Sequence, residues 1–120
     1  MKVAIPVWND RVSPVLDTAA RLLVVRVEND QVTSRAVFGI DEKDLTGRCS
    51  RIRGLNIDTL ICGAVSHPFL RMLLASGLDV IREISGKTDE VLDAYLHGDI
   101  SHSKFLLPGS EKSRSGHAGK

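Results

Sequence analysis

The stretch Leu60-Ile61-Cys62-Gly63-Ala64-Val65-Ser66-His67-Pro68 decides how the rest of this 120-residue chain is arranged. Its apolar start, residues 59–62, is typical of a buried parallel strand, because such strands are covered on both faces. Ser66 followed by Pro68 is typical of a helix N-terminus. A strand that turns tightly into a helix directs backbone N–H groups at the adjacent space, which suits an anionic ligand. The same pattern also fits an ordinary strand-to-helix turn that binds nothing.

Composition excludes several classes of protein. Hydrophobic residues make up 42% of the chain, which is enough for the core of one domain. The net charge of +1 and the scarcity of aromatic residues provide neither the charge nor the stacking surface that nucleic-acid binding needs. No apolar run approaches the roughly 20 residues that span a bilayer, and no signal peptide is recognisable. The two cysteines have no disulfide-framework spacing. We therefore expect a cytoplasmic protein without nucleic-acid or membrane partners, either a monomer or a weak homodimer.

Hydrophobic periodicity and turn residues predict an alternation of strands and helices. Loop residues occupy positions 9–14, and a short helical turn is expected at 16–20. Asn29 and Asp30 have the chemistry of a hairpin turn. Pro6 is expected near the carboxyl end of its strand or at a bulge, because it cannot donate to a sheet ladder. The predicted strands are residues 2–8, 21–28, 31–38, 58–62 and 78–84, and the predicted helices are residues 44–55, 67–76 and 89–96.

This order predicts a single α/β domain over residues 1–100. An antiparallel meander followed by right-handed β-α-β crossovers gives a mixed, five-stranded sheet flanked by helices. The first strand is expected beside the fourth, where the chain reverses its winding direction. Ligands of such sheets bind at that switch point, so residues 9–14 and 63–67 are expected to line one crevice. Residues 101–120 are rich in Ser, Gly, Lys and Arg and are predicted to be a disordered tail.

The residue types present argue against an enzyme. Cys62 and His67 could form a nucleophile and base, but no third orienting group accompanies them. Central strands carry no paired carboxylates, no phosphate-binding loop is complete, and no Cys or His pair has zinc-site spacing. Cys49 lies on the apolar stripe of its predicted helix, which favours a buried thiol over a metal ligand. Arg48 belongs to a cluster of arginines that either forms a solvated face or, beside the crevice, favours an anion.

Four motifs in register resemble the dinitrogenase iron–molybdenum cofactor biosynthesis family, whose members include NifX, the C-terminal domain of NifB and small stand-alone proteins. The motifs span roughly residues 1–100. Nitrogenase-associated members often have His-Phe after Ser-Pro, where this chain has Val15-Leu16, so the stand-alone members are more similar to it. The motifs are Met1-Lys2-Val3-Ala4-Ile5-Pro6-Val7, Arg11-Val12-Ser13-Pro14, Ile61-Cys62-Gly63-Ala64-Val65-Ser66-His67-Pro68, and Ser85-Gly86 with the helix from Val91 to Ile100.

The resemblance implies a ribonuclease-H-like fold without nuclease residues, and a non-enzymatic protein that binds or carries an anionic iron- and/or molybdenum–sulfur cluster. Cofactor-assembly proteins would be its partners. Arg11, Ser13 and Pro14 would form one wall of the site. The other wall would consist of Cys62, Gly63, Ala64, Ser66 and His67. Cys62 and His67 are the candidate direct ligands, although Cys62 could equally close its strand in the core. The alternative is a regulatory or protein-interaction module of the same fold that no longer binds a cluster.

Overall fold

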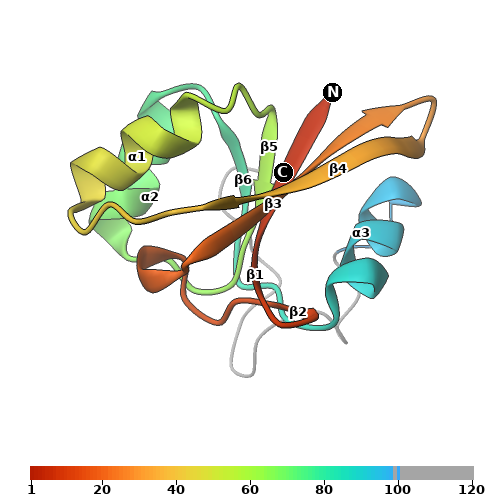
Figure 1. The fold of residues 1–120 in the computed structure, drawn as a ribbon, viewed down its shortest axis with the longest axis horizontal. Coiled ribbons are helices and arrows are strands. Elements are labelled where there is room, and N and C mark those ends of the chain that lie inside the picture. The colour runs from red at the N-terminus through yellow and green to blue at the C-terminus, as the bar shows by residue number, and fades with distance from the viewer. Residues whose placement is uncertain (99, 101–120) are drawn as a thin grey trace.

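The computed structural model describes residues 1–98 and 100, so the predicted tail at 101–120 lies outside the described residues. Strands and helices alternate after an initial meander (Figure 1). In that part of the chain, no helix is long and apolar enough to cross a membrane. The elements are β1 (Lys2–Trp8), β2 (Arg11–Val12), the 3-10 turn η1 (Leu16–Thr18), β3 (Arg21–Glu28), β4 (Gln31–Gly39), α1 (Leu45–Arg53), β5 (Thr59–Ile61), α2 (His67–Ala75), β6 (Asp79–Ile81) and α3 (Thr88–Leu96).

The strands form one mixed sheet in the order β4-β3-β1-β5-β6. β1 pairs antiparallel with β3 and parallel with β5, and β5 pairs parallel with β6. The predicted neighbourhood of the first and fourth strands is therefore confirmed. The expectation of a plain loop at residues 9–14 is wrong, because β2 adds a sixth strand there. Its two residues pair with β1, as Val7 with Val12 and Trp8 with Arg11.

Local sequence explains where the elements begin and end. Asn29 and Asp30 both adopt positive φ values, 54° and 62°, as a tight hairpin between β3 and β4 requires. Asp44 caps α1 by accepting a hydrogen bond from the Gly47 N–H. The predicted strand at 78–84 ends early, at Ile81, because the chain turns at Glu83, which has a φ of 65°.

Two hydrophobic cores lie on opposite faces of the sheet. α1 and α2 cover one face and α3 covers the other, as Figure 1 shows. Side chains of β1 alternate between the two cores, with Ala4 facing α1 and α2 and with Val3 and Ile5 facing α3. Pro6 lies beyond Val3 and Ala4, the β1 residues that pair with β5, so its missing N–H costs no bond to that strand.

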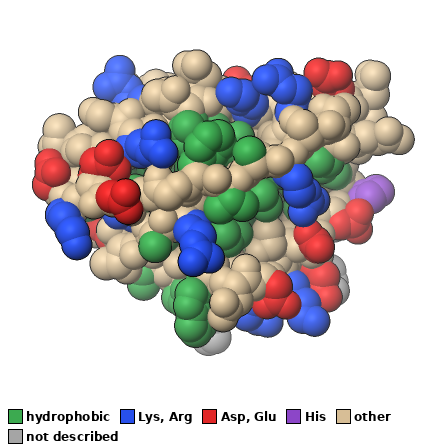
Figure 2. Space-filling view, viewed as in Figure 1, with side chains coloured by type: hydrophobic (Ala, Val, Ile, Leu, Met, Phe, Trp, Pro, Cys, Tyr) green, Lys and Arg blue, Asp and Glu red, His purple; other side chains and the backbone are tan. Residues whose placement is uncertain are grey.

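The β3–β4 hairpin extends past the helices that cover the sheet. β4 forms an edge of the sheet, and most of its residues are exposed on both faces. Figure 2 shows hydrophobic side chains in the middle of this view of the molecule, with Lys and Arg side chains around them. The deeply buried residues instead belong to β1, β3, β5, β6 and the helices. These four strands therefore form the part of the sheet that is packed on both faces.

Candidate functional site

Two loops that are distant in sequence meet at the carboxyl ends of β1 and β5. The Ala64 N–H donates to the Pro14 carbonyl, and the Leu16 N–H donates to the Ala64 carbonyl, both at 2.8 Å. A Cβ atom on Gly63 would lie 2.6 Å from the Pro14 oxygen and 2.7 Å from that of Ser13. Only glycine permits this approach. The structure thus brings together the two predicted walls, and they touch at their base.

A third loop, between β6 and α3, joins the same place. The Glu83 N–H donates to the Gly63 carbonyl at 2.9 Å, and the Val12 N–H donates to the Gly86 carbonyl at 3.0 Å. Further backbone bonds run from Ile84 to Cys62 and from Thr88 to Asp10. We call residues 9–15, 62–67 and 82–88 the loop junction. Backbone hydrogen bonds between all three segments fix its shape.

Asp17 occupies the N-terminus of α2. One carboxylate oxygen accepts from the Ser66 N–H at 2.8 Å, and the other accepts from the Ser66 hydroxyl at 2.5 Å. Ser66 in turn caps the helix, with its hydroxyl 3.4 Å from the Phe69 nitrogen. The negative charge that a helix N-terminus favours is therefore supplied from within the chain. Sequence reasoning missed Asp17, because no local pattern links residues 49 positions apart.

Cys62 lies in the core between the sheet and α2. Its side chain has no exposed surface, and it packs in the same cluster as Leu60 and Phe69. Burial raises the pKa of the Cys62 thiol to about 12; the nearby positive charge of Arg82 lowers it, while Asp17 raises it. A thiol that holds its proton so strongly is a poor nucleophile and a poor metal ligand. Cys49 is buried too, at 7% exposure, in the same core.

Arg48 lies away from the junction and stabilises the chain around η1. Its guanidinium donates to the carbonyls of Leu16 and Ala19, at 2.9 and 2.6 Å, and to that of Glu42 at 3.0 Å. Desolvation lowers the pKa of Arg48, while the carboxylates of Asp17 and Glu42 oppose that effect. The guanidinium thus links α1, η1 and the segment after β4, a role that a surface-charge pattern does not reveal.

The residues of the junction differ in their exposure to solvent, and some of its backbone N–H groups have no partner. Arg11, Pro14 and His67 are exposed, whereas Ser13 is buried at 7% exposure. Two cations that sequence reasoning missed also lie there. Lys87 is exposed and forms a β-bridge with Arg11, and Arg82 is half-buried. Within the described residues, no acceptor pairs with the backbone N–H groups of Gly63, Val65 and His67.

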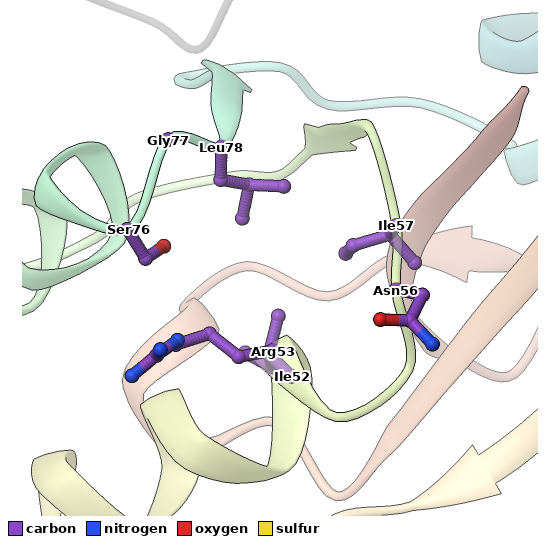
Figure 3. Close-up of a pocket in the computed structure, with 7 residues that line it drawn as sticks. All are labelled: Ile52, Arg53, Asn56, Ile57, Ser76, Gly77 and Leu78. Carbon is purple, nitrogen blue, oxygen red and sulfur yellow. The ribbon is translucent and has the colours of Figure 1, made fainter.

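The opposite, amino ends of the parallel strands look different. A pocket of about 200 Å³ lies there, between the end of α1 and the turn after α2. Figure 3 shows Ile52, Ile57 and Leu78 pointing toward a common space. Arg53 extends along one side of it, near Ser76. We call this the amino-end pocket.

Ligand sets for a bare metal ion are missing from the described residues. No group of three or more His, Cys, Asp or Glu side chains lies close enough together in residues 1–98 and 100 to hold one. Cys62 and His67, the two predicted direct ligands, differ in exposure, since Cys62 is buried and His67 faces solvent.

Comparison with known proteins gives the family. The chain belongs to the dinitrogenase iron–molybdenum cofactor family, whose model matches residues 1–98. An uncharacterised protein of Methanocaldococcus jannaschii is 21% identical over 105 residues, covering 83% of this chain and 89% of that protein. The chain is thus related to proteins of the iron–molybdenum cofactor.

Solved structures share the fold. A proposed dinitrogenase from Methanocaldococcus jannaschii matches with a TM-score of 0.68 and 22% identity, covering 82% of this chain and 90% of that one. The apo form of the orange protein from Desulfovibrio gigas matches with a TM-score of 0.69 and 16% identity, covering 82% and 88%. At these identities the likeness shows a common α/β architecture.

Proposed function

We propose that this protein binds and carries an anionic iron- and/or molybdenum–sulfur cluster, or a precursor of one, at the loop junction, without catalysing a reaction. The observation that carries the proposal is the combination of unpaired N–H groups at Gly63, Val65 and His67 with the cations Arg11 and Lys87. Backbone N–H groups in a turn before a helix are donors that anions use in many proteins. Family membership supports the same cargo.

The donor set fits a preformed cluster better than a bare ion. A sulfide-bridged metal anion supplies most of its own ligands, so it needs hydrogen-bond donors and positive charge more than three protein ligands. His67 is the one predicted direct ligand that faces solvent, at the first position of α2. We assign it that role, because imidazole suits iron. Cys62, with its raised pKa, instead closes β5 in the core.

The other residues predicted for the site determine the conformation of its loops and do not contact the cluster. Gly63 and Ala64 allow the contact with Ser13 and Pro14, and Ser66 fixes the start of α2. Arg48 is a positioning residue, because it holds the carbonyls on either side of Asp17. Cys49 fills the core.

The fold, the absence of catalysis and the partner proteins are assigned on the following grounds. The strand order β4-β3-β1-β5-β6 supports a ribonuclease-H-like fold. The raised pKa of Cys62 supports a carrier rather than a thiol enzyme. Cofactor-assembly proteins are the partners that such a carrier would serve, since it must receive its cargo and pass it on.

Anaerobic reconstitution tests the proposal. Protein incubated with iron, molybdate and sulfide, and then desalted without oxygen, should retain molybdenum or iron together with sulfide and show charge-transfer absorption. A Cys62→Ala variant should retain as much, because the thiol is not a ligand. Retention no greater than that of an unrelated protein treated in the same way would refute carriage.

The alternative, an interaction module of the same fold, also has support. Asp17 already satisfies the N-terminus of α2, and Trp8 is 63% exposed beside Arg11 at the end of the β1–β2 pair. An exposed aromatic side chain is a common anchor of protein interfaces. Such a module would bind its partner equally well with and without metal and sulfide, whereas a carrier would bind an assembly partner differently when loaded.

A further inference from the structure

Three side chains form one row across the loop junction. Trp8 pairs directly with Arg11 in the β1–β2 ladder, and Arg11 pairs in turn with Lys87, the residue before α3. Residues directly opposite each other on neighbouring strands point to the same face of a sheet. An aromatic side chain and two cations therefore lie side by side on one face, with Arg11 in the middle.

The pair of Arg11 and Lys87 is of the closely spaced kind. Backbone hydrogen bonds enclose it on both sides, between the residues next to Arg11 and those next to Lys87, at 3.0 and 2.8 Å. A pair that is enclosed in this way makes no backbone hydrogen bond of its own, and its Cα atoms lie about 4.5 Å apart. The two positive charges are thus close enough to act on one anion.

All three side chains of the row are accessible to a ligand. Val7 and Val12, the next pair of the same ladder, point toward the core beneath α3, so Trp8 and Arg11 point to the opposite face, where α2 begins. Trp8 is 63% exposed, and Arg11 and Lys87 are exposed too. An anion that Arg11 binds can therefore lie against the indole ring beside it.

We propose that Trp8 makes the loop junction selective for metal anions that carry sulfur over those that carry oxygen, an inference that rests on the proposed function. Molybdate and tetrathiomolybdate have the same charge, so Arg11 and Lys87 attract both. Molybdate would lose strongly held water against the indole ring, which offers a single N–H donor in return. Tetrathiomolybdate presents polarizable sulfur, which makes favourable contacts at the edge of an aromatic ring.

The indole N–H of Trp8 offers a direct test. The chain contains one tryptophan, so a nitrogen-15 spectrum of the labelled full chain shows one indole signal, which needs no assignment. Tetrathiomolybdate, added without oxygen, should shift this signal in a saturable way. Its dissociation constant is measured from the same titration, and that of molybdate from its displacement of tetrathiomolybdate. The wild type should bind molybdate more weakly.

Three variants make the result specific. Trp8→Ala should weaken binding of tetrathiomolybdate about two- to tenfold and leave the affinity for molybdate unchanged, because the contact that it removes is to sulfur. Trp8→Phe keeps an aromatic edge and should retain most of the preference. Leu74→Ala is the matched control, since Leu74 is apolar and 40% exposed but lies near the end of α2, and it should change neither affinity.

The outcomes separate this inference from the proposed function. No saturable binding of tetrathiomolybdate by the wild type would refute carriage, and the selectivity with it. Binding by the wild type with an indole signal that does not move, or with the same ratio of affinities in Trp8→Ala, would overturn the role of Trp8 alone. A loss of preference in Trp8→Phe as large as that in Trp8→Ala would do the same.

Discussion

The two ends of the parallel strands β1, β5 and β6 differ in what their loops present. At the carboxyl ends, three loops are joined by backbone hydrogen bonds and present Arg11, Lys87 and His67 to solvent. At the amino ends, apolar side chains such as Ile57 and Leu78 line the pocket together with polar ones such as Asn56 and Ser76. The same strands thus carry a loop junction with exposed cations at one end and a small pocket of mixed polar and apolar lining at the other.

The difference shows how a sheet concentrates binding potential at one end. Strand-to-helix turns lie at the carboxyl ends, so N–H groups at the starts of helices point there, and the winding direction reverses beside β1. Helix-to-strand turns lie at the amino ends, where helices present carbonyl groups instead.

The largest effect is expected at Gly63. A methyl group there would meet two carbonyl oxygens at less than 3 Å, neither of which belongs to a flexible side chain. Gly63→Ala should therefore lower the free energy of unfolding by about 3 kcal/mol, measured by denaturant titration. Gly39→Ala is the control, because nothing lies within 4 Å of its added Cβ, and it should change the free energy by less than about 0.5 kcal/mol. Equal effects would show that the loops do not touch.

Asp17 should come next. Asp17→Ala removes two hydrogen bonds to Ser66 and should cost about 2 kcal/mol of stability. Because it also frees the Ser66 N–H and removes a negative charge, it should raise the affinity for tetrathiomolybdate. Asp89→Ala is a matched control, since that carboxylate lies in the first turn of α3 but is 83% exposed, and it should cost about 0.5 kcal/mol or less. The account would be contradicted if Asp89→Ala raised the affinity for tetrathiomolybdate, or if Asp17→Ala left that affinity unchanged.

Cys62 predicts a dependence of stability on pH. Its pKa rises from 9.0 in the unfolded chain to about 12 in the folded one, because burial disfavours the thiolate. The native state therefore keeps a proton that the unfolded state releases, so this contribution is complete below pH 9 and is lost as the pH rises toward 12. The loss should approach about 1.4 kcal/mol per pH unit.

Single substitutions isolate that effect. Stability measured from pH 8 upward should decline less steeply in Cys62→Ala than in the wild type. Identical slopes in the two proteins would place Cys62 in contact with solvent, and so return it to the list of candidate ligands.

The smallest effects are expected from single cations of the junction. Arg11→Gln, Arg82→Gln and Lys87→Gln should each weaken binding of tetrathiomolybdate about three- to tenfold, which corresponds to about 0.7–1.4 kcal/mol. Added salt should reduce these differences. Arg53→Gln, at the amino-end pocket, should have no effect on the affinity. The affinities are measured without oxygen, from the absorption of the anion. If Arg53→Gln weakened binding as much as the other three substitutions, the assignment of the anion to the loop junction would be wrong.

Much of the fold could be predicted from the sequence because local patterns determine it. Asn29 and Asp30 predict the hairpin through their tolerance of positive φ, and Ser66 with Pro68 predicts the start of α2. The rule that parallel crossovers are right-handed then places β1 beside β5. These signals lie within a few residues of one another, so no knowledge of tertiary contacts is needed.

The details of the site could not be predicted in this way. β2 has two residues, too few for an alternating pattern, and exists only through its pairing with β1. Arg48 looks like part of a charged helix face, but its hydrogen bonds reach carbonyls up to 32 residues away. Asp17 and Ser66 likewise meet only in the folded chain. Contacts of this kind decide which donors remain unpaired.

Chemical-shift mapping of tetrathiomolybdate binding tests the central claim most directly. Two-dimensional spectra of the nitrogen-15-labelled chain would be recorded without oxygen as the anion is added. The account predicts saturable shifts at the amides of Gly63, Val65 and His67, with the amides of Asn56 and Gly77 at the amino-end pocket unchanged. Shifts centred on Asn56 and Gly77, or no saturable shift at the loop junction, would contradict it.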